Sequence, residues 1–152
     1  MRYAVDLDSE VRTIRNAAIF RGLDPAKMRL LACMSEQLTF GAGELVCTQG
    51  EPSDAAFLIL EGEIEFTLET PQGEQILGRQ GKGTMFGEVG VLCDRERFAS
   101  VRAVTPLSVM RINKDALLRM MNDNAQLSVA VARELACRVV RLAERAGNET
   151  AH

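Results

Sequence analysis

Glu88 and Arg97 are charged residues inside a largely apolar stretch, residues 85–103, which reads MFGEVGVLCDRERFASVRA. Gly87 frees the backbone just before Glu88, and the segment that follows has room for about two helical turns. The first amides of so short a helix lack internal acceptors and can face an anion. An arginine fork suits a phosphate, and a carboxylate accepts hydrogen bonds from vicinal sugar hydroxyls. Phosphate on one side and ribose on the other predict a nucleotide site.

Other chemistry is excluded by the residues that the sequence lacks. A triphosphate fits poorly, because only one arginine suits a phosphate and no G-x-x-x-x-G-K-[ST] loop occurs. The single histidine is His152, the last residue, so neither a histidine-ligated metal site nor a histidine-activated nucleophile can be built inside the fold. The cysteines form no C-x-x-C pair that would suggest zinc or an iron–sulfur cluster. A hydrolase that uses carboxylates alone stays open in principle, but no pair of acids stands out for it. We therefore expect no catalytic residue, no metal and no cofactor, and a protein that is not an enzyme.

The composition is that of one soluble globular domain. The chain has 152 residues, of which 47% are hydrophobic and 26% charged, and its net charge of −3 argues against nucleic-acid binding through a basic surface. No signal peptide or membrane-spanning run is present in the sequence, and we expect no membrane partner. Cys33, Cys47, Cys93 and Cys137 are expected to be buried free thiols in a reducing compartment, so the predicted location is cytoplasmic.

Three zones follow one another along the chain: helices over 1–35, short β-runs over 36–112 and helices over 113–147. Asp24 and Pro25 form an N-cap and first turn for a helix, and Asn113 caps another. The β-runs are EQLTF, ELVCTQ, AAFLILEGEIEFTLE, EQILGR, FASVRAV and LSVMRI. Many short strands with glycine between them predict a mainly β sandwich or roll with flanking helices, and not a doubly wound sheet.

The last helix, about 125–146, has an unusually wide apolar face. One stripe contains Leu127, Val131, Leu135, Val139 and Leu142, and the residues that widen it are Val129, Ala132, Ala136, Val140 and Ala143. A polar stripe contains Glu134, Arg138, Arg141 and Arg145. The helix either packs on the β-roll alone or also pairs with its twin in a homodimer. The pattern leaves both open, and we expect a homodimer through this helix.

The stretch from Phe86 to Ala103 resembles the phosphate-binding cassette of the cyclic-nucleotide-binding domain family. The Phe-Gly-Glu start, the small and apolar run after it and the later Arg-x-Ala-Ser segment are all present without insertion or deletion. The glycine-spaced run GELVCTQGEPSDAAFLILEGEIEF, together with NAAIFRGL before it and INKDALLRMM after it, is also similar to family segments. The resemblance covers nearly the whole chain, which it presents as a single domain over 1–152.

The resemblance implies an antiparallel eight-stranded β-roll, a double-stranded β-helix of jelly-roll type, with N-terminal helices and a C-terminal helix pair. It implies a ligand site with Glu88 at the ribose 2′-hydroxyl and Arg97 at the cyclic phosphate, assisted by backbone amides of Gly87 and Ala99. The ligand-binding residues expected on this basis are Phe86, Gly87, Glu88, Val89, Arg97, Phe98, Ala99 and Ser100. In the family, movement of the helix after the roll carries the signal.

Two departures from the family pattern bear on ligand and context. Phe98 stands where a threonine is associated with cyclic GMP, which favours cyclic AMP and leaves cyclic GMP or an empty pocket as alternatives. The sequence contains no winged helix-turn-helix, so no DNA binding by this chain is expected. It is then either a stand-alone sensor that acts on a downstream protein partner, the sensor half of a transcription factor, or a relative that binds no nucleotide.

Overall fold

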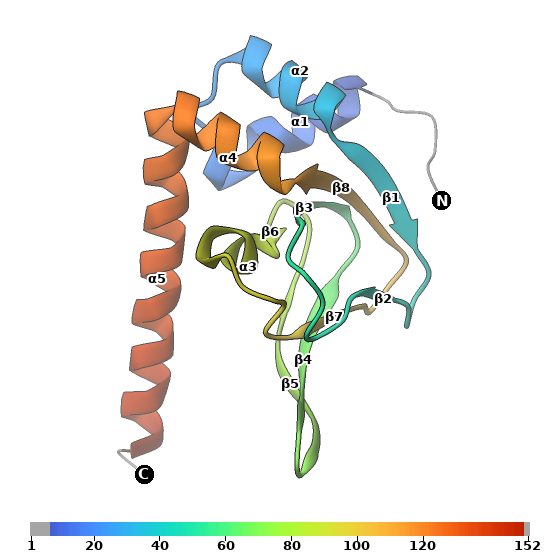
Figure 1. Ribbon diagram of the computed structural model, residues 1–152, viewed down its shortest axis with the longest axis vertical. Coiled ribbons are helices and arrows are strands. Elements are labelled where there is room, and N and C mark those ends of the chain that lie inside the picture. Colours follow the sequence, from blue (N-terminus) through green and yellow to red (C-terminus); the bar gives the residue numbers. More distant parts are fainter. Residues whose placement is uncertain (1–6, 151–152) are drawn as a thin grey trace.

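A computed structural model describes residues 7–150, and it confirms the predicted β-roll (Figure 1). His152 and the first six residues of the predicted N-terminal helical zone lie outside the described residues. Eight antiparallel strands form two four-stranded sheets, with helices before and after them. One sheet has the order β1-β8-β3-β6 and the other the order β2-β7-β4-β5.

The strands follow the predicted runs closely, with one addition. Their bounds are β1 Glu36–Phe40, β2 Leu45–Cys47, β3 Ala55–Glu61, β4 Ile64–Thr70, β5 Gly73–Gln80, β6 Met85–Phe86, β7 Ser100–Ala103 and β8 Leu107–Asn113. The run from Ala55 to Glu69 is divided by Gly62, whose φ of +96° suits glycine and whose added Cβ would lie 2.3 Å from the Pro106 carbonyl oxygen. The two-residue β6 was not predicted, because it is too short to show a period.

Helices α2 and α4 begin directly after the predicted caps, Asp24 and Asn113. Their bounds are α1 Leu7–Asn16, η1 Ala18–Phe20 (a 3-10 turn), α2 Pro25–Met34, α3 Glu88–Cys93, α4 Lys114–Asp123 and α5 Ala125–Thr150. The Asp24 side chain accepts a hydrogen bond from the Ala26 amide, and Asn113 accepts one from the Ala116 amide at 2.8 Å. Both side chains therefore satisfy amides that the helix itself leaves unpaired.

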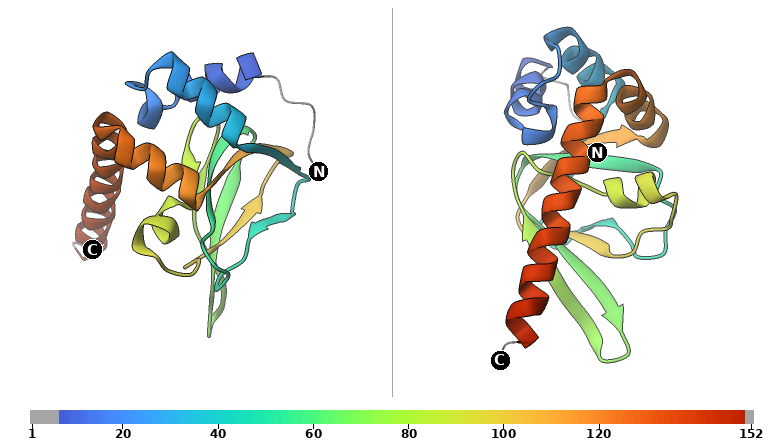
Figure 2. Two further views of the ribbon diagram at one scale, coloured as in Figure 1. Left: turned by 45° about the horizontal axis from the view of Figure 1, so that its top comes forward. Right: turned by 90° about the vertical axis from the view of Figure 1, so that its left-hand side faces the viewer.

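Strand β3 separates two hydrophobic clusters. Ala55, Phe57 and Ile59 face the interior of the roll, whereas Ala56, Leu58 and Leu60 face the helices on the other side. Six successive residues of β3 are buried for this reason, which explains its continuous apolar sequence. The helices α1, α2 and α4 cover this outer face at one end of the roll (Figures 1 and 2).

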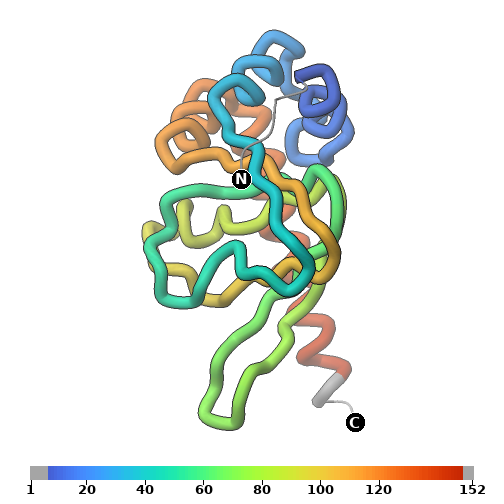
Figure 3. Tube along the Cα trace, turned by 90° about the vertical axis from the view of Figure 1, so that its right-hand side faces the viewer, coloured from blue at the N-terminus to red at the C-terminus, as the bar shows by residue number. Residues whose placement is uncertain are grey.

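Helix α5 runs the length of the molecule from the helical end toward the tip of the β4–β5 hairpin (Figures 2 and 3). Leu127 and Val131 are buried among the other helices, but Val139 and Leu142 are exposed over 64% and 62% of their surface. The apolar stripe expected from the sequence therefore divides into a packed half and an exposed half.

The cysteines match the prediction only in part. Cys47 is buried in the roll, whereas Cys33, Cys93 and Cys137 are exposed, and all four are free thiols. The expectation of buried thiols is therefore wrong at three positions, because those side chains lie on outward-facing helical surfaces. None of the helices within residues 7–150 is long and apolar enough to cross a bilayer.

Candidate functional site

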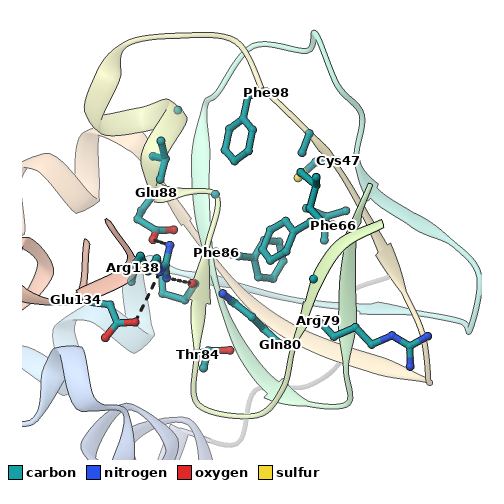
Figure 4. A pocket seen from close by; sticks show the side chains of 18 of the residues that line it. Cys47, Phe66, Arg79, Gln80, Thr84, Phe86, Glu88, Phe98, Glu134 and Arg138 are labelled. Atoms are coloured by element: carbon teal, nitrogen blue, oxygen red, sulfur yellow. Dashed lines mark hydrogen bonds and ion pairs between the residues drawn. The ribbon is translucent and has the colours of Figure 1, made fainter. Parts of the chain in front are cut away.

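A cavity of about 670 Å³ lies between the roll interior, the segment from β6 to β7 and helix α5 (Figure 4). The roll contributes Cys47, Phe66, Phe86 and Val101, and the α5 side contributes Glu134, Arg138, Arg141, Leu142 and Arg145. A cavity of this size, mostly apolar with a few charged groups, has the dimensions of a small-molecule site.

Gly87 sets the geometry of the β6–α3 turn. Its φ of +81° lies in the left-handed region, and it is the residue directly before helix α3. A Cβ at this position would lie 2.7 Å from Nη1 of Arg97, so glycine also allows the arginine to approach the backbone. The six-residue α3 has the short length predicted from the sequence.

Arg97 is buried, with 7% of its surface exposed, and is held from several sides. Its Nη1 donates to the Gly87 carbonyl at 2.9 Å, and its Nη2 donates to the Ala55 carbonyl at 2.6 Å. The guanidinium lies 5.7 Å from the ring centroid of Phe57, and Nη2 is 3.8 Å from the Asp54 carboxylate. A guanidinium has five N–H donors, so it can hold these carbonyls and still donate to an anion in the cavity.

Glu88 is the most deeply buried charged residue of the cavity, with 1% of its surface exposed. Its Oε1 accepts a hydrogen bond from Nη1 of Arg138 at 2.6 Å, and Nη2 of Arg138 donates to the Met85 carbonyl at 3.2 Å. Its other oxygen, Oε2, is buried and has no hydrogen-bond partner among the described residues. Arg138 therefore connects helix α5 directly to Glu88, the carboxylate that is expected from the sequence to contact a ribose hydroxyl.

Burial raises the pKa of Glu88, and the nearby Arg138 opposes this rise only in part. Removing a carboxylate from water disfavours its charged form, so half-satisfied burial of this kind is costly. A ligand hydroxyl that donated to Oε2 would stabilise the ionised carboxylate. Glu134 lies behind the same arginine, with 3.6 Å between its Oε1 and Nε of Arg138.

The residues predicted from the sequence gather at this cavity with one exception. Phe86, Gly87, Glu88, Val89, Arg97, Phe98 and Ala99 all line it, and Phe98 is exposed over 58% of its surface. Ser100 does not line it. The Ser100 hydroxyl instead accepts a hydrogen bond from the Gln49 amide at 2.9 Å, because alternation along β7 turns Val101, and not Ser100, toward the roll interior.

Several lining residues were not predicted as site residues. The polar stripe of α5 was visible in the sequence as Glu134, Arg138, Arg141 and Arg145, but nothing local showed that it faces the cavity. Gln80 at the end of β5 also lines it, and Figure 4 shows its side chain reaching toward Phe86. Its position could have been found only from the pairing register of the sheet.

The cyclic nucleotide-binding domain model matches residues 37–124, which is more than half of the chain. The chain belongs to this family. The matched segment runs from β1 to the end of α4 and includes the cavity wall from Phe86 to Ala99.

Relatives include regulators and kinases. The chain is 29% identical over 129 residues to the CRP-like cAMP-activated global transcriptional regulator of Mycobacterium tuberculosis, covering 84% of this chain and 58% of the regulator. It is 34% identical over 106 residues to mouse cGMP-dependent protein kinase 2, covering 68% of this chain and 13% of the kinase. The chain thus matches only part of the length of these relatives.

A solved structure with a similar fold is the sensor domain of the transcriptional regulator DNR from Pseudomonas aeruginosa. The two share 26% sequence identity with a TM-score of 0.80, and the match covers 91% of this chain and 93% of the sensor domain.

Proposed function

We propose that this chain is a sensor domain that binds a cyclic nucleotide, by preference cyclic AMP, in the cavity between the roll and α5. In this proposal Glu88 accepts a hydrogen bond from the ribose 2′-hydroxyl, and Arg97 pairs with the cyclic phosphate. Phe86, Gly87, Val89, Phe98 and Ala99 shape the wall between these two charges. The chain binds its ligand without transforming it.

The observation that carries this proposal is the half-satisfied carboxylate of Glu88. A buried acceptor without a partner costs roughly 1–3 kcal/mol, and more when it is charged. A structural ion pair with Arg138 would account for Oε1, but it leaves Oε2 unsatisfied. A sugar hydroxyl is a donor of the right kind for that oxygen, and the Arg97 guanidinium is available to the phosphate on the same ligand.

Helix α5 is the element through which occupancy of the cavity is communicated. Arg138 donates to both Glu88 and the Met85 carbonyl, so a ligand that engages Glu88 changes the charge environment of an α5 side chain directly. Because ligand and helix share one carboxylate, binding shifts the position or order of α5 by as much as its differential affinity allows.

Cyclic AMP is favoured over cyclic GMP for two reasons. At Phe98 the chain lacks the threonine that is associated with cyclic GMP in the family, and the Mycobacterium relative is named as cAMP-activated. The kinase relative named for cGMP makes cyclic GMP the second candidate ligand.

We also propose that α5 forms a homodimer with a second copy of the chain. Val129, Ala132, Ala136, Val139 and Ala143 are exposed and spaced three, four, three and four residues apart, on the side of α5 away from Leu127 and Val131. This is the heptad spacing of a two-helix seam, and the small side chains allow close approach of the helices. The same stripe on both copies is self-complementary, as a two-fold interface requires.

Isothermal titration calorimetry with cyclic AMP, cyclic GMP, linear AMP and ATP tests the ligand assignment. We expect cyclic AMP to bind at least as tightly as cyclic GMP, and linear AMP far more weakly, because its extra charge and open phosphate do not suit a single buried arginine. Equal affinity for ATP and cyclic AMP, or no heat with any cyclic nucleotide, would overturn the proposal.

A further inference from the structure

We infer that Gln80 is a specificity-determining residue that reads the base of the nucleotide, and that its amide selects adenine through the edge that carries the 6-amino group. The inference rests on the proposed function and deepens it by assigning the base end of the cavity. The residues that carry it are Gln80, Gly78 and Phe66.

The register of the sheet turns Gln80 toward the interior of the roll. On β4, Ile64 pairs with Gln80 of β5 and also with Ala103 of β7, and both Ile64 and Ala103 belong to the buried cluster inside the roll. Side chains of directly paired residues lie on the same face of a sheet. Gln80 therefore faces inward beside two apolar residues, Ile64 and Ala103, to which it is linked by strand pairing. A polar side chain at such an inward position is unusual and points to a specific partner.

The amide of Gln80 is incompletely satisfied. Its Oε1 is buried and accepts no hydrogen bond from any of the described residues. Glu88 Oε2 is the other lining atom of this kind, so the cavity wall carries two buried acceptors that both call for donors. A ligand that satisfies both must carry a donor at each of two separate places.

The two acceptors lie in the order that a nucleotide requires. In Figure 4, Phe98 and Gln80 stand at opposite ends of the cavity, and Glu88 lies between them on one wall. Nη1 of Arg97 reaches the Gly87 carbonyl, directly beside Glu88 in the chain. A phosphate at Arg97 and a ribose at Glu88 therefore leave the Gln80 end of the cavity for the base.

The neighbouring row leaves room for a flat ring. Gly78 pairs with Phe66, so it faces inward as well, and a Cβ built on Gly78 would meet no atom within 4 Å. Its φ does not require glycine, and the missing side chain instead opens space beside the Phe66 ring. An aromatic ring beside open space is a stacking surface for a base.

Adenine fits this end of the cavity better than guanine. On the edge that carries N7, adenine offers a 6-amino donor beside an acceptor, whereas guanine offers two acceptors, O6 and N7. A glutamine amide pairs with the adenine edge in two hydrogen bonds, and its Oε1 then accepts from the amino group. Guanine presented by this edge would leave Oε1 without a donor.

A comparison of two ligands on two proteins tests the inference. Cyclic AMP and the 3′,5′-cyclic monophosphate of purine riboside, which has hydrogen in place of the 6-amino group, are titrated into wild type and Gln80→Leu. For wild type we expect the purine riboside ligand to bind about 5- to 100-fold more weakly than cyclic AMP, because Oε1 of Gln80 then stays buried and unpaired. In Gln80→Leu the two ligands should bind equally within error. Gln75→Leu, the same change at an exposed position on β5 outside the cavity, should discriminate as wild type does.

A second variant tests the position of the base. Gly78→Val should fold normally and weaken both ligands, since the added side chain takes the space beside Phe66. If Gln80→Leu does not fold, judged by circular dichroism, Gln80→Met replaces it as an unbranched apolar substitute of similar length.

Three results would overturn the inference. Wild type could bind both ligands equally, the discrimination could persist in the Gln80 variant, or Gly78→Val could leave affinities unchanged. If wild type binds no cyclic nucleotide, the proposed function fails and this assignment falls with it. Failure of the base assignment alone is distinguished by tight binding of cyclic AMP to wild type.

Discussion

Replacement of Arg97 by alanine should damage ligand binding and folding separately, and both effects can be estimated. In the proposed complex the guanidinium donates to the cyclic phosphate in a buried site. Charge-assisted hydrogen bonds contribute about 1.5–3 kcal/mol each, so loss of a two-pronged contact should weaken cyclic AMP binding by at least about tenfold, and by about a hundredfold or more if both bonds are strong. Arg97→Lys should recover only part of this, because a point charge does not reproduce the fork.

The contacts of Arg97 predict that Arg97→Ala also destabilises the fold. The carbonyls of Gly87 and Ala55 both accept from this guanidinium and would lose their donor. Unpaired buried carbonyls cost about 1–3 kcal/mol each, so we expect roughly 2–6 kcal/mol of lost stability. For a chain of this size that lowers the melting temperature by roughly 4–24 °C. Asp54 adds little, because its side chain is 71% exposed.

The assay is calorimetric titration with cyclic AMP at a temperature where circular dichroism shows each variant folded. Arg102→Ala is the matched control, because it removes the same charge from β7, where Arg102 pairs with Glu74 at 2.9 Å and does not line the cavity. The control should bind as wild type does. Unchanged affinity in folded Arg97→Ala, together with the expected fall in melting temperature, would show that Arg97 is purely structural and refute the ligand assignment.

Three further outcomes are expected. Burial raises the pKa of Glu88, so ionisation of this carboxylate destabilises the folded state as the pH rises above the ordinary glutamate value of 4.5. The melting temperature of Glu88→Gln should therefore rise relative to that of wild type with increasing pH, while the variant binds cyclic AMP more weakly than wild type does. A melting-temperature advantage of the variant that shrinks with pH would contradict this sign. In sedimentation equilibrium Ala136→Glu should be monomeric, whereas Cys137→Glu, which lies outside the heptad-spaced residues of α5, should remain a dimer. A wild type that is itself monomeric, together with two monomeric variants, would refute the dimer. In chemical denaturation Gly62→Ala should lower the free energy of unfolding by at least about 2 kcal/mol more than Gly43→Ala, because both glycines have positive φ but only at Gly62 would a Cβ collide with a backbone carbonyl. Equal losses of stability in the two variants would contradict this steric explanation.

Much of the fold was predictable because its signals are local. Asp24 and Asn113 cap helices through their own side chains, so the starts of α2 and α4 could be predicted from a few neighbouring residues. The left-handed glycine before Glu88 is likewise a matter of backbone preference. These features need no knowledge of distant parts of the chain.

Which residues of a strand face the interior of the roll depends less on near neighbours in the chain. Ser100 was predicted to contact ligand, yet Val101 and Ala103 occupy the inward positions of β7 and leave Ser100 on the other face. Alternation of the apolar residues carried this information, but the cassette pattern outweighed it in the prediction. Gln80 faces inward only because of its register against Ile64, which no single strand reveals.

The residue types of the site and the local turns that present them follow from the amino-acid sequence alone, because glycine conformation, caps and the spacing from Glu88 to Arg97 depend on near neighbours. Which of these charges meet depends on the tertiary structure. Arg138 lies 50 residues from Glu88 in the chain and reaches it because α5 packs through Leu127 and Val131. Arg97 holds two carbonyls from separate segments for the same reason. Contacts between distant residues depend on how whole elements pack, and the energies that set that packing are spread over the entire core.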